Sequence, residues 1–274
     1  MANQQDNHYK IVAILFAVLT FWWVYNFLYI SHDSSTNLIF GAVYGTTMTA
    51  IGVLYGFYYA KRWGGWNSVV GRAILALSLG LMAQFFGQAV FSYYNIVLKV
   101  SVPYPSLADI GYFGSIPLYI YGMWLFSKAA GVKVLTGSVW QHFNTVLIPL
   151  GLLIFSYLFF LRHYEFDFTS PLKIFLDFGY PFGQAIYVSF ALLAYVLSRS
   201  TLGGLLRGNV LLFIYALLAQ YVADFNFLYQ SLHGTWYNGG YGDYMYLFAY
   251  FLMVTAIVQF GTAYTKINSK VVEK

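Results

Sequence analysis

Long apolar stretches separated by short polar segments run through the whole chain. A helix that spans a lipid bilayer needs about 20 mainly apolar residues. Eight stretches have this length, at 9–30, 38–60, 71–98, 107–128, 142–162, 172–198, 207–231 and 242–265. The pattern therefore predicts an all-α fold, a polytopic membrane helical bundle of about eight transmembrane helices with no soluble domain.

Composition points to the same class of protein. Hydrophobic residues make up 60% of the chain and charged residues 8%, whereas soluble domains are roughly 25% charged. Cysteine is absent, so neither a disulfide nor a thiolate metal site is available. The first apolar stretch lacks a small-residue cleavage site, and we expect it to be retained rather than removed as a signal peptide.

The distribution of basic residues predicts the orientation. With the N-terminus in the cytoplasm, eleven Lys and Arg residues fall inside, and only Lys99, Arg162 and Lys173 fall outside. Because cytoplasmic loops are enriched in Lys and Arg, both termini are predicted to be cytoplasmic in a cell membrane. This topology accounts for the net charge of +5. The lipid bilayer is then the expected partner, and nucleic acid is not.

The chain contains an internal repeat at an offset of 136 residues. Residues 81–88 (LMAQFFGQ) match residues 217–224 (LLAQYVAD), and at the same offset Tyr44 matches Tyr180. Four helices per half is an even number, so both halves are expected to insert in the same direction. In such parallel repeats, a site commonly forms where the halves meet. The sequence predicts two four-helix membrane repeats, at 1–136 and 137–274.

Polar groups within the helices gather toward the predicted outer side. The acidic residues of the helices fall at their outer ends or in their outer third, and the inner halves carry no acid. Gln84 and Gln88 are four residues apart, as are Gln220 and Asp224, so each pair shares one helix face. We expect these groups to form a cup open to the outside. The candidate ligand-binding residues are Gln84, Gln88, Gln220, Asp224, Asp109 and Asp243.

Each of these groups also has a purely structural interpretation. Amides and carboxyls hydrogen-bond across packed membrane helices. Asp109 and Asp243 each begin the last helix of a half, where a carboxylate can cap free backbone N–H groups. Asp177 follows Lys173 by four residues, which predicts a surface ion pair. The many Tyr and Phe residues suit either ligand stacking or packing.

Catalytic and cofactor motifs are largely missing. Residues 240–243 read G-x-G-D, which resembles the catalytic motif of intramembrane aspartyl proteases, but the Tyr-Asp and Pro-Ala-Leu elements of that family are absent. The sequence contains no H-E-x-x-H pair and no phosphate-binding loop. We therefore expect no catalytic residue, metal or cofactor.

One segment resembles known membrane proteins. Residues 102–112 (VPYPSLADIGY), with the preceding stretch 71–88, resemble the multi-helix membrane regions that precede diguanylate cyclase domains in bacterial signalling proteins. They also resemble stand-alone, uncharacterised prokaryotic multi-pass membrane proteins. The resemblance implies a sensor-like membrane region. Because the sequence ends at Lys274 without an output domain, signalling would require a separate partner.

Three functional hypotheses follow from the sequence. The first is a membrane module that senses or binds a small ligand in the outward-facing cup. The second is a transporter or channel for a small solute, which the acid-free inner halves disfavour. The third is a structural subunit of a larger membrane complex. The sequence identifies neither a ligand nor a reaction.

Overall fold

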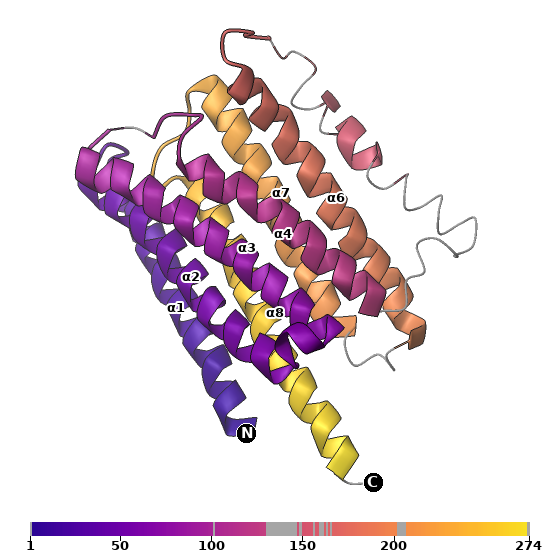
Figure 1. Cartoon of the computed structure of the whole chain (residues 1–274). Coiled ribbons are helices and arrows are strands. Elements are labelled where there is room, and N and C mark those ends of the chain that lie inside the picture. Colours follow the sequence, from indigo (N-terminus) through magenta and orange to yellow (C-terminus); the bar gives the residue numbers. More distant parts are fainter. Residues whose placement is uncertain are drawn as a thin grey trace.

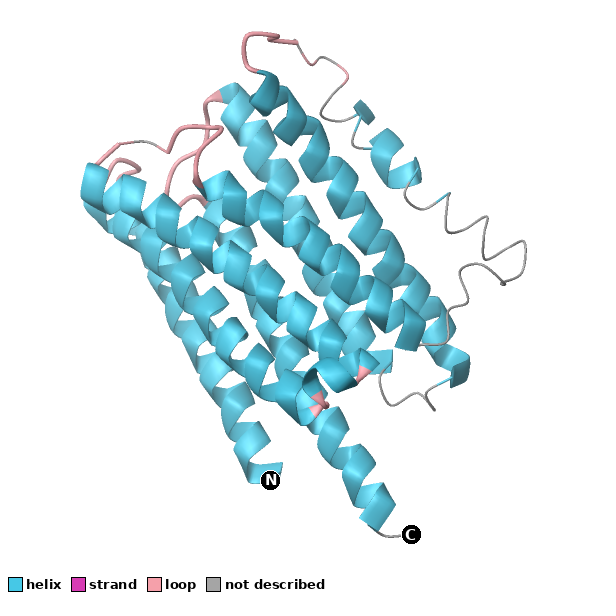
Figure 2. Ribbon diagram, in the orientation of Figure 1, coloured by secondary structure: helices cyan, strands magenta, loops and turns pink. Residues whose placement is uncertain are grey.

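The chain folds into a bundle of long α-helices. The computed structural model describes residues 2–100, 102–129, 147, 150–155, 157–158, 162, 164, 166–201 and 207–272. Over these residues there is no β-strand, and Figure 2 shows helices joined by loops. Their α-helices are α1 Ala2–Tyr29, α2 Ser35–Arg62, α3 Val69–Ser92, α4 Ala108–Ala129, α6 Pro171–Thr201, α7 Arg207–His233 and α8 Tyr241–Val272. A 3-10 turn, η1 Gly65–Asn67, follows α2, and a π-helix, η2 Tyr93–Leu98, continues α3.

Five segments of these helices are long and apolar enough to cross a membrane. They are Asn7–Tyr29, Ser35–Arg62, Val69–Leu98, Gly208–Ser231 and Tyr241–Thr265. Large apolar side chains such as Phe21, Leu54 and Phe182 are exposed on the outside of the bundle. Soluble proteins rarely expose extensive apolar surface, whereas lipid would cover it. The structure therefore supports a helical membrane protein.

The helices pack as a closed ring in which the first and second halves of the chain meet at two places. Helix α2 packs against α3 and α8, and α4 packs against α3 and α6. Helix α7 packs against α6 and α8, and α1 lies along α8 and α2. Both chain ends lie at one end of the bundle (Figure 1). The opposite end, which we call the loop end, is formed by residues 30–34, 102–107 and 234–240.

Local sequence explains where α2 and α3 begin. The Ser34 side chain accepts a hydrogen bond from the Thr36 N–H at 3.3 Å, and the Ser68 side chain accepts one from the Gly71 N–H at 2.8 Å. Serine is a favoured N-cap residue because its oxygen satisfies a backbone donor of the first turn. Between the two helices, Gly64 has φ +89°, a left-handed conformation that glycine adopts readily.

Helices α3 and α4 approach closely at a pair of glycines. A Cβ atom on Gly111 would collide with the Ala83 carbonyl oxygen and with the backbone of Gly87. Small residues of this kind allow membrane helices to pack backbone against backbone. The close approach brings the Ser115 side chain of α4 within 2.8 Å of the Gln84 amide nitrogen of α3.

The positions of the helices agree with the sequence prediction for seven of the eight apolar stretches. The eighth stretch, 142–162, lies mainly outside the described residues, and so does the predicted boundary between the repeats at 136–137. Among the described residues, an all-helical bundle with five helices long and apolar enough to cross a membrane is thus confirmed. The count of eight spans, the parallel repeat and the cytoplasmic termini stay predictions.

Candidate functional site

A cavity of about 240 Å³ lies at the loop end of the bundle. Its lining comes from α2, α3 with η2, α4, α6, α7, α8 and the loops before α4 and α8. We call this cavity the loop-end pocket. Of the six candidate residues, four line it: Gln88, Asp109, Asp224 and Asp243. Gln84 and Gln220 lie one helical turn deeper on α3 and α7.

Asp109 lies at the start of α4 and closes the first turn. Its Oδ2 accepts the Ser106 backbone N–H at 2.7 Å, while the Ser106 hydroxyl accepts the Ala108 N–H at 3.2 Å. This reciprocal arrangement is a capping box, with aspartate in the place of the usual glutamate. The predicted capping role of Asp109 is therefore confirmed. In addition, its Oδ1 accepts a hydrogen bond from the Tyr180 hydroxyl of α6 at 2.8 Å.

Asp243 has the corresponding position at the start of α8. Its Oδ2 accepts the Gly239 backbone N–H at 2.6 Å, and its Oδ1 accepts the Tyr44 hydroxyl of α2 at 3.0 Å. The preceding turn depends on Gly239, which has φ +80°, a value that favours glycine. This N–H lies in the turn before α8 and not in the helix itself, so the carboxyl group fixes the turn, and its side chain is only 1% exposed.

The two tyrosine–aspartate pairs connect the predicted halves in both directions. Tyr44 and Tyr180 are matching positions of the predicted repeat. In the structure, Tyr44 of the first half binds Asp243 of the second, and Tyr180 of the second half binds Asp109 of the first. Each carboxyl group is thus stabilised by a hydroxyl from the other half.

Asp224 lies on α7 in a setting of neutral donors. The Tyr246 hydroxyl donates to its Oδ1 at 2.7 Å, and the Gln220 amide donates to both oxygens at 3.2 Å. The Gln184 amide of α6 also donates to Oδ2. The predicted shared face of Gln220 and Asp224 is therefore a direct contact within the site.

The glutamines of α3 join their helix to α4 and α8. Tyr250 of α8 donates its hydroxyl hydrogen to Gln84 Oε1 at 2.9 Å, and the Gln88 amide nitrogen lies 3.3 Å from the same hydroxyl. The Gln84 amide in turn donates to Ser115. These contacts match the structural interpretation, interhelical hydrogen bonding. Only Gln88 also reaches the loop-end pocket.

The expectation that Asp177 forms a surface ion pair is wrong, because the residue is buried. It is 5% exposed, and it accepts hydrogen bonds from the Tyr104 and Tyr164 hydroxyls, each at 2.7 Å. These tyrosines precede α4 and α6, so helical spacing on α6 alone could not reveal them. Burial and the hydrogen bond to Asp177 raise the pKa of Tyr104.

Three aromatic rings of the pocket lining lie edge to face. The Tyr104 and Phe227 centroids are 6.2 Å apart with planes at 81°, and the Phe227 and Trp236 centroids are 5.0 Å apart with planes at 78°. We call Tyr104, Phe227 and Trp236 the aromatic triad. It was not predicted, because its members come from two loops and α7 and share no sequence spacing.

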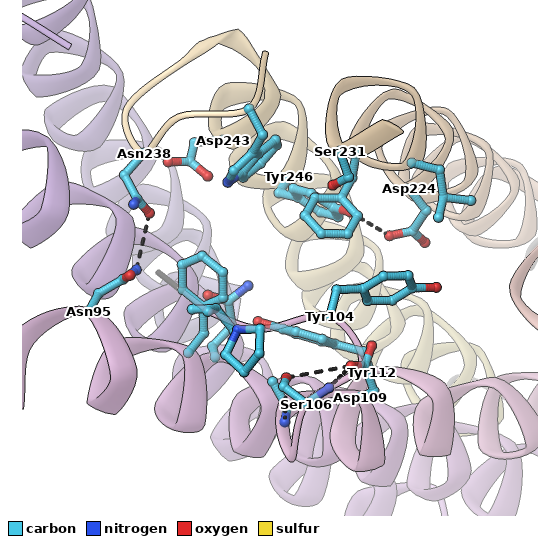
Figure 3. Close-up of a pocket in the computed structure, with 18 of the residues that line it drawn as sticks. Asn95, Tyr104, Ser106, Asp109, Tyr112, Asp224, Ser231, Asn238, Asp243 and Tyr246 are labelled. Carbon is cyan, nitrogen blue, oxygen red and sulfur yellow. Dashed lines mark hydrogen bonds between the residues drawn. The ribbon is translucent and has the colours of Figure 1, made fainter. Parts of the chain in front are cut away.

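The loop-end pocket collects its polar groups from opposite sides. Figure 3 shows Asp243 and Asp224 across the pocket from Asp109, and Asn95 bonded to Asn238 between η2 and the loop before α8. Asn95 is positioned by the π-helix, a feature often found at functional sites. No hydrogen bond joins two of the three carboxyl groups among the described residues.

A metal centre is not indicated by the described part of the chain. It contains no group of three or more His, Cys, Asp or Glu residues placed to hold an ion. The chemistry of the pocket is instead that of carboxylates held by neutral donors beside aromatic rings. Comparison with protein-family models, with curated proteins and with solved structures finds no match to this chain.

Proposed function

We propose that this chain is an integral membrane protein that binds a small ligand in the loop-end pocket, with a sensing role. The observation that carries the proposal is the pocket itself. It has a volume of about 240 Å³ and gathers three carboxyl groups from three different helices. Ligand sites typically combine apolar walls with a few convergent polar groups, and this lining has that character.

Orientation supports ligand entry from outside the cell. The loops before α4 and α8, which contribute to the pocket lining, lie at the end of the bundle opposite both chain ends (Figure 1). The predicted topology places both chain ends in the cytoplasm, because Lys and Arg are concentrated on that side. The loop end would then face outward, as expected for a receptor of external ligands.

Packing beneath the pocket favours binding over conduction. Moving along α3 from Gln84 toward the chain ends, Leu81 and Leu77 are fully buried. On α8, Met253 follows Tyr250 in the same direction and is 2% exposed. A solute path would have to pass these close-packed apolar side chains. A sensor needs no such path.

The natural absence of cysteine allows a direct test of pocket access. Ser231 is exposed at the pocket lining, and Gly208 is exposed at the other end of the same helix, α7. In intact cells, we expect a membrane-impermeant maleimide to label Ser231→Cys but not Gly208→Cys. Permeabilised cells should label both variants. Labelling of Gly208→Cys alone in intact cells would overturn the proposed orientation.

Ligand binding itself is tested with purified protein in nanodiscs. A panel of cationic, anionic and neutral small molecules is screened by thermal unfolding, and we expect at least one compound to raise the melting temperature. The stabilisation should disappear in Ser231→Trp, in which a large ring fills the mouth. If no compound stabilises the protein, the ligand-binding proposal fails. Solute flux in proteoliposomes that Asp224→Asn abolishes would instead indicate transport.

A further inference from the structure

We infer that the ligand of the loop-end pocket is a small organic cation with a diffuse charge, such as a methylated ammonium compound. This inference rests on the proposed function, since it assumes that the pocket binds a ligand. It specifies the chemical class from three observations: the charge of the lining, the way its carboxyl groups are held, and the aromatic triad.

The lining of the pocket is acidic without any basic residue. Asp109, Asp224 and Asp243 line it, and no Lys, Arg or His does among the described residues. The donors to these carboxyl groups are hydroxyls, amides and backbone N–H groups, all of them neutral. A concave surface lined by one sign of charge concentrates ligands of the opposite sign. The missing countercharge is therefore expected on the ligand.

The carboxyl groups are held apart rather than directed at one point. Asp243 accepts from Tyr44 and Gly239, whereas Asp109 accepts from Tyr180 and Ser106 on the other side of the pocket. A compact metal ion requires several oxygens converging within about 2–2.6 Å of it. A cation that spreads its charge over several carbon atoms needs no such convergence, because it responds to the combined field of all three acids.

The aromatic triad supplies the second element of cation recognition. Trp and Tyr faces attract cations placed within about 6 Å of the ring centre, and quaternary ammonium groups are often held by several rings. Tyr104, Phe227 and Trp236 all line the cavity, and the planes of neighbouring rings lie at 81° and 78° to each other. The volume of about 240 Å³ is below the ~300–1,000 Å³ of drug-sized sites, which suits a small ligand.

The test compares choline with 3,3-dimethylbutan-1-ol, which has the same shape but no charge. Binding to the full chain in nanodiscs is measured by calorimetry and by thermal unfolding. We expect choline to bind and the neutral analogue to bind at least tenfold more weakly. Trp236→Ala and Asp243→Asn should each weaken choline binding about fivefold or more, whereas the exposed-site controls Trp66→Ala and Asp33→Asn should leave it unchanged.

Each other outcome has a defined meaning. Equal binding of the neutral analogue, or stabilisation by neutral or anionic panel compounds alone, overturns the cation class and leaves the ligand-binding proposal intact. Choline binding that Trp236→Ala and Asp243→Asn leave unchanged places the cation elsewhere and also overturns it. If no compound of the panel, choline included, binds or stabilises the protein, both proposals fail. If Trp236→Ala lowers the melting temperature without ligand, Trp236→Phe replaces it, with a smaller expected loss of affinity.

Discussion

The two sides of the loop-end pocket use the same tyrosine–aspartate pair at different depths. Asp243 is 1% exposed and its partner Tyr44 is 2% exposed. Asp109 is half-buried, and its partner Tyr180 is 9% exposed. Both carboxyl groups accept a backbone N–H just before or at the start of a helix and bind a hydroxyl from the other predicted half. The same pair of contacts is therefore almost fully buried at Asp243 and partly exposed at Asp109.

This difference in burial suggests different roles for the two pairs, one in the stability of the bundle and the other in the response to a ligand. Burial makes a lost hydrogen bond costly, because the freed donors cannot turn to water. At Asp109 the donors can rehydrate through the pocket. The Asp243 side is thus expected to carry more of the stability. The Asp109 side, next to the aromatic triad residue Tyr104, is better placed to rearrange when a ligand enters.

The largest expected effect is the loss of the buried carboxyl group. Asp243→Ala leaves the Gly239 N–H and the Tyr44 hydroxyl without their acceptor, which should lower the free energy of unfolding by about 3 kcal/mol. Asp109→Ala should cost about 1–2 kcal/mol, because its donors reach the pocket. Unfolding in mixed detergent micelles measures both values. The matched control is Asp33→Ala, at an exposed loop position, and equal losses at Asp243 and Asp109 would remove the proposed difference.

A smaller effect is expected from the hydroxyl groups alone. Tyr44→Phe deletes one hydrogen bond and keeps the ring, so it should cost about 1 kcal/mol, with about 0.5 kcal/mol for Tyr180→Phe. The same unfolding measurement applies, with the exposed Tyr121→Phe as the control. Combining Tyr44→Phe with Asp243→Asn should lower the free energy of unfolding by less than the sum of the two single changes. Both changes act on the same hydrogen bond, between the Tyr44 hydroxyl and the Asp243 carboxyl group. Additive losses would show that the two residues are not coupled.

Local features of the fold could be predicted from the sequence. The apolar stretches gave the helix positions, because the length needed to cross a bilayer is fixed by its thickness. The capping role of Asp109 was also predicted, because it depends on contacts only three residues away. The predicted repeat matched Tyr44 to Tyr180, but it did not reveal what either hydroxyl binds.

The rest of the site depends on contacts between distant parts of the chain. Tyr44 and Asp243 are separated by 199 positions, and Tyr104 and Asp177 by 73. No helical spacing relates such residues, so they become neighbours only through the packing of α2 on α8 and of α4 on α6. For the same reason the spacing of Lys173 and Asp177 was misleading. Tertiary hydrogen bonds from two tyrosines outweigh the local pairing.

The smallest expected effect compares the loops before α4 and α8 at high pH. Burial and the hydrogen bond to Asp177 raise the pKa of Tyr104, and burial raises the pKa of Tyr237. The folded chain therefore holds these protons more tightly than the unfolded chain. Each tyrosine contributes its full stabilisation below the ordinary tyrosine pKa of about 10, and this contribution decreases as the pH rises above that value.

Removing Tyr104 should consequently flatten the loss of stability in alkali. Between about pH 9.5 and 11, we expect the free energy of unfolding to fall less in Tyr104→Phe than in the unchanged protein. Tyr237→Phe should flatten the curve less. The Tyr237 ring stacks on His32 at 4.0 Å, but among the described residues its hydroxyl has no carboxyl group as hydrogen-bond partner. Parallel curves for Tyr104→Phe and the unchanged protein would argue against a tighter hold on the Tyr104 proton. A larger flattening in Tyr237→Phe than in Tyr104→Phe would contradict the expected order of the two effects.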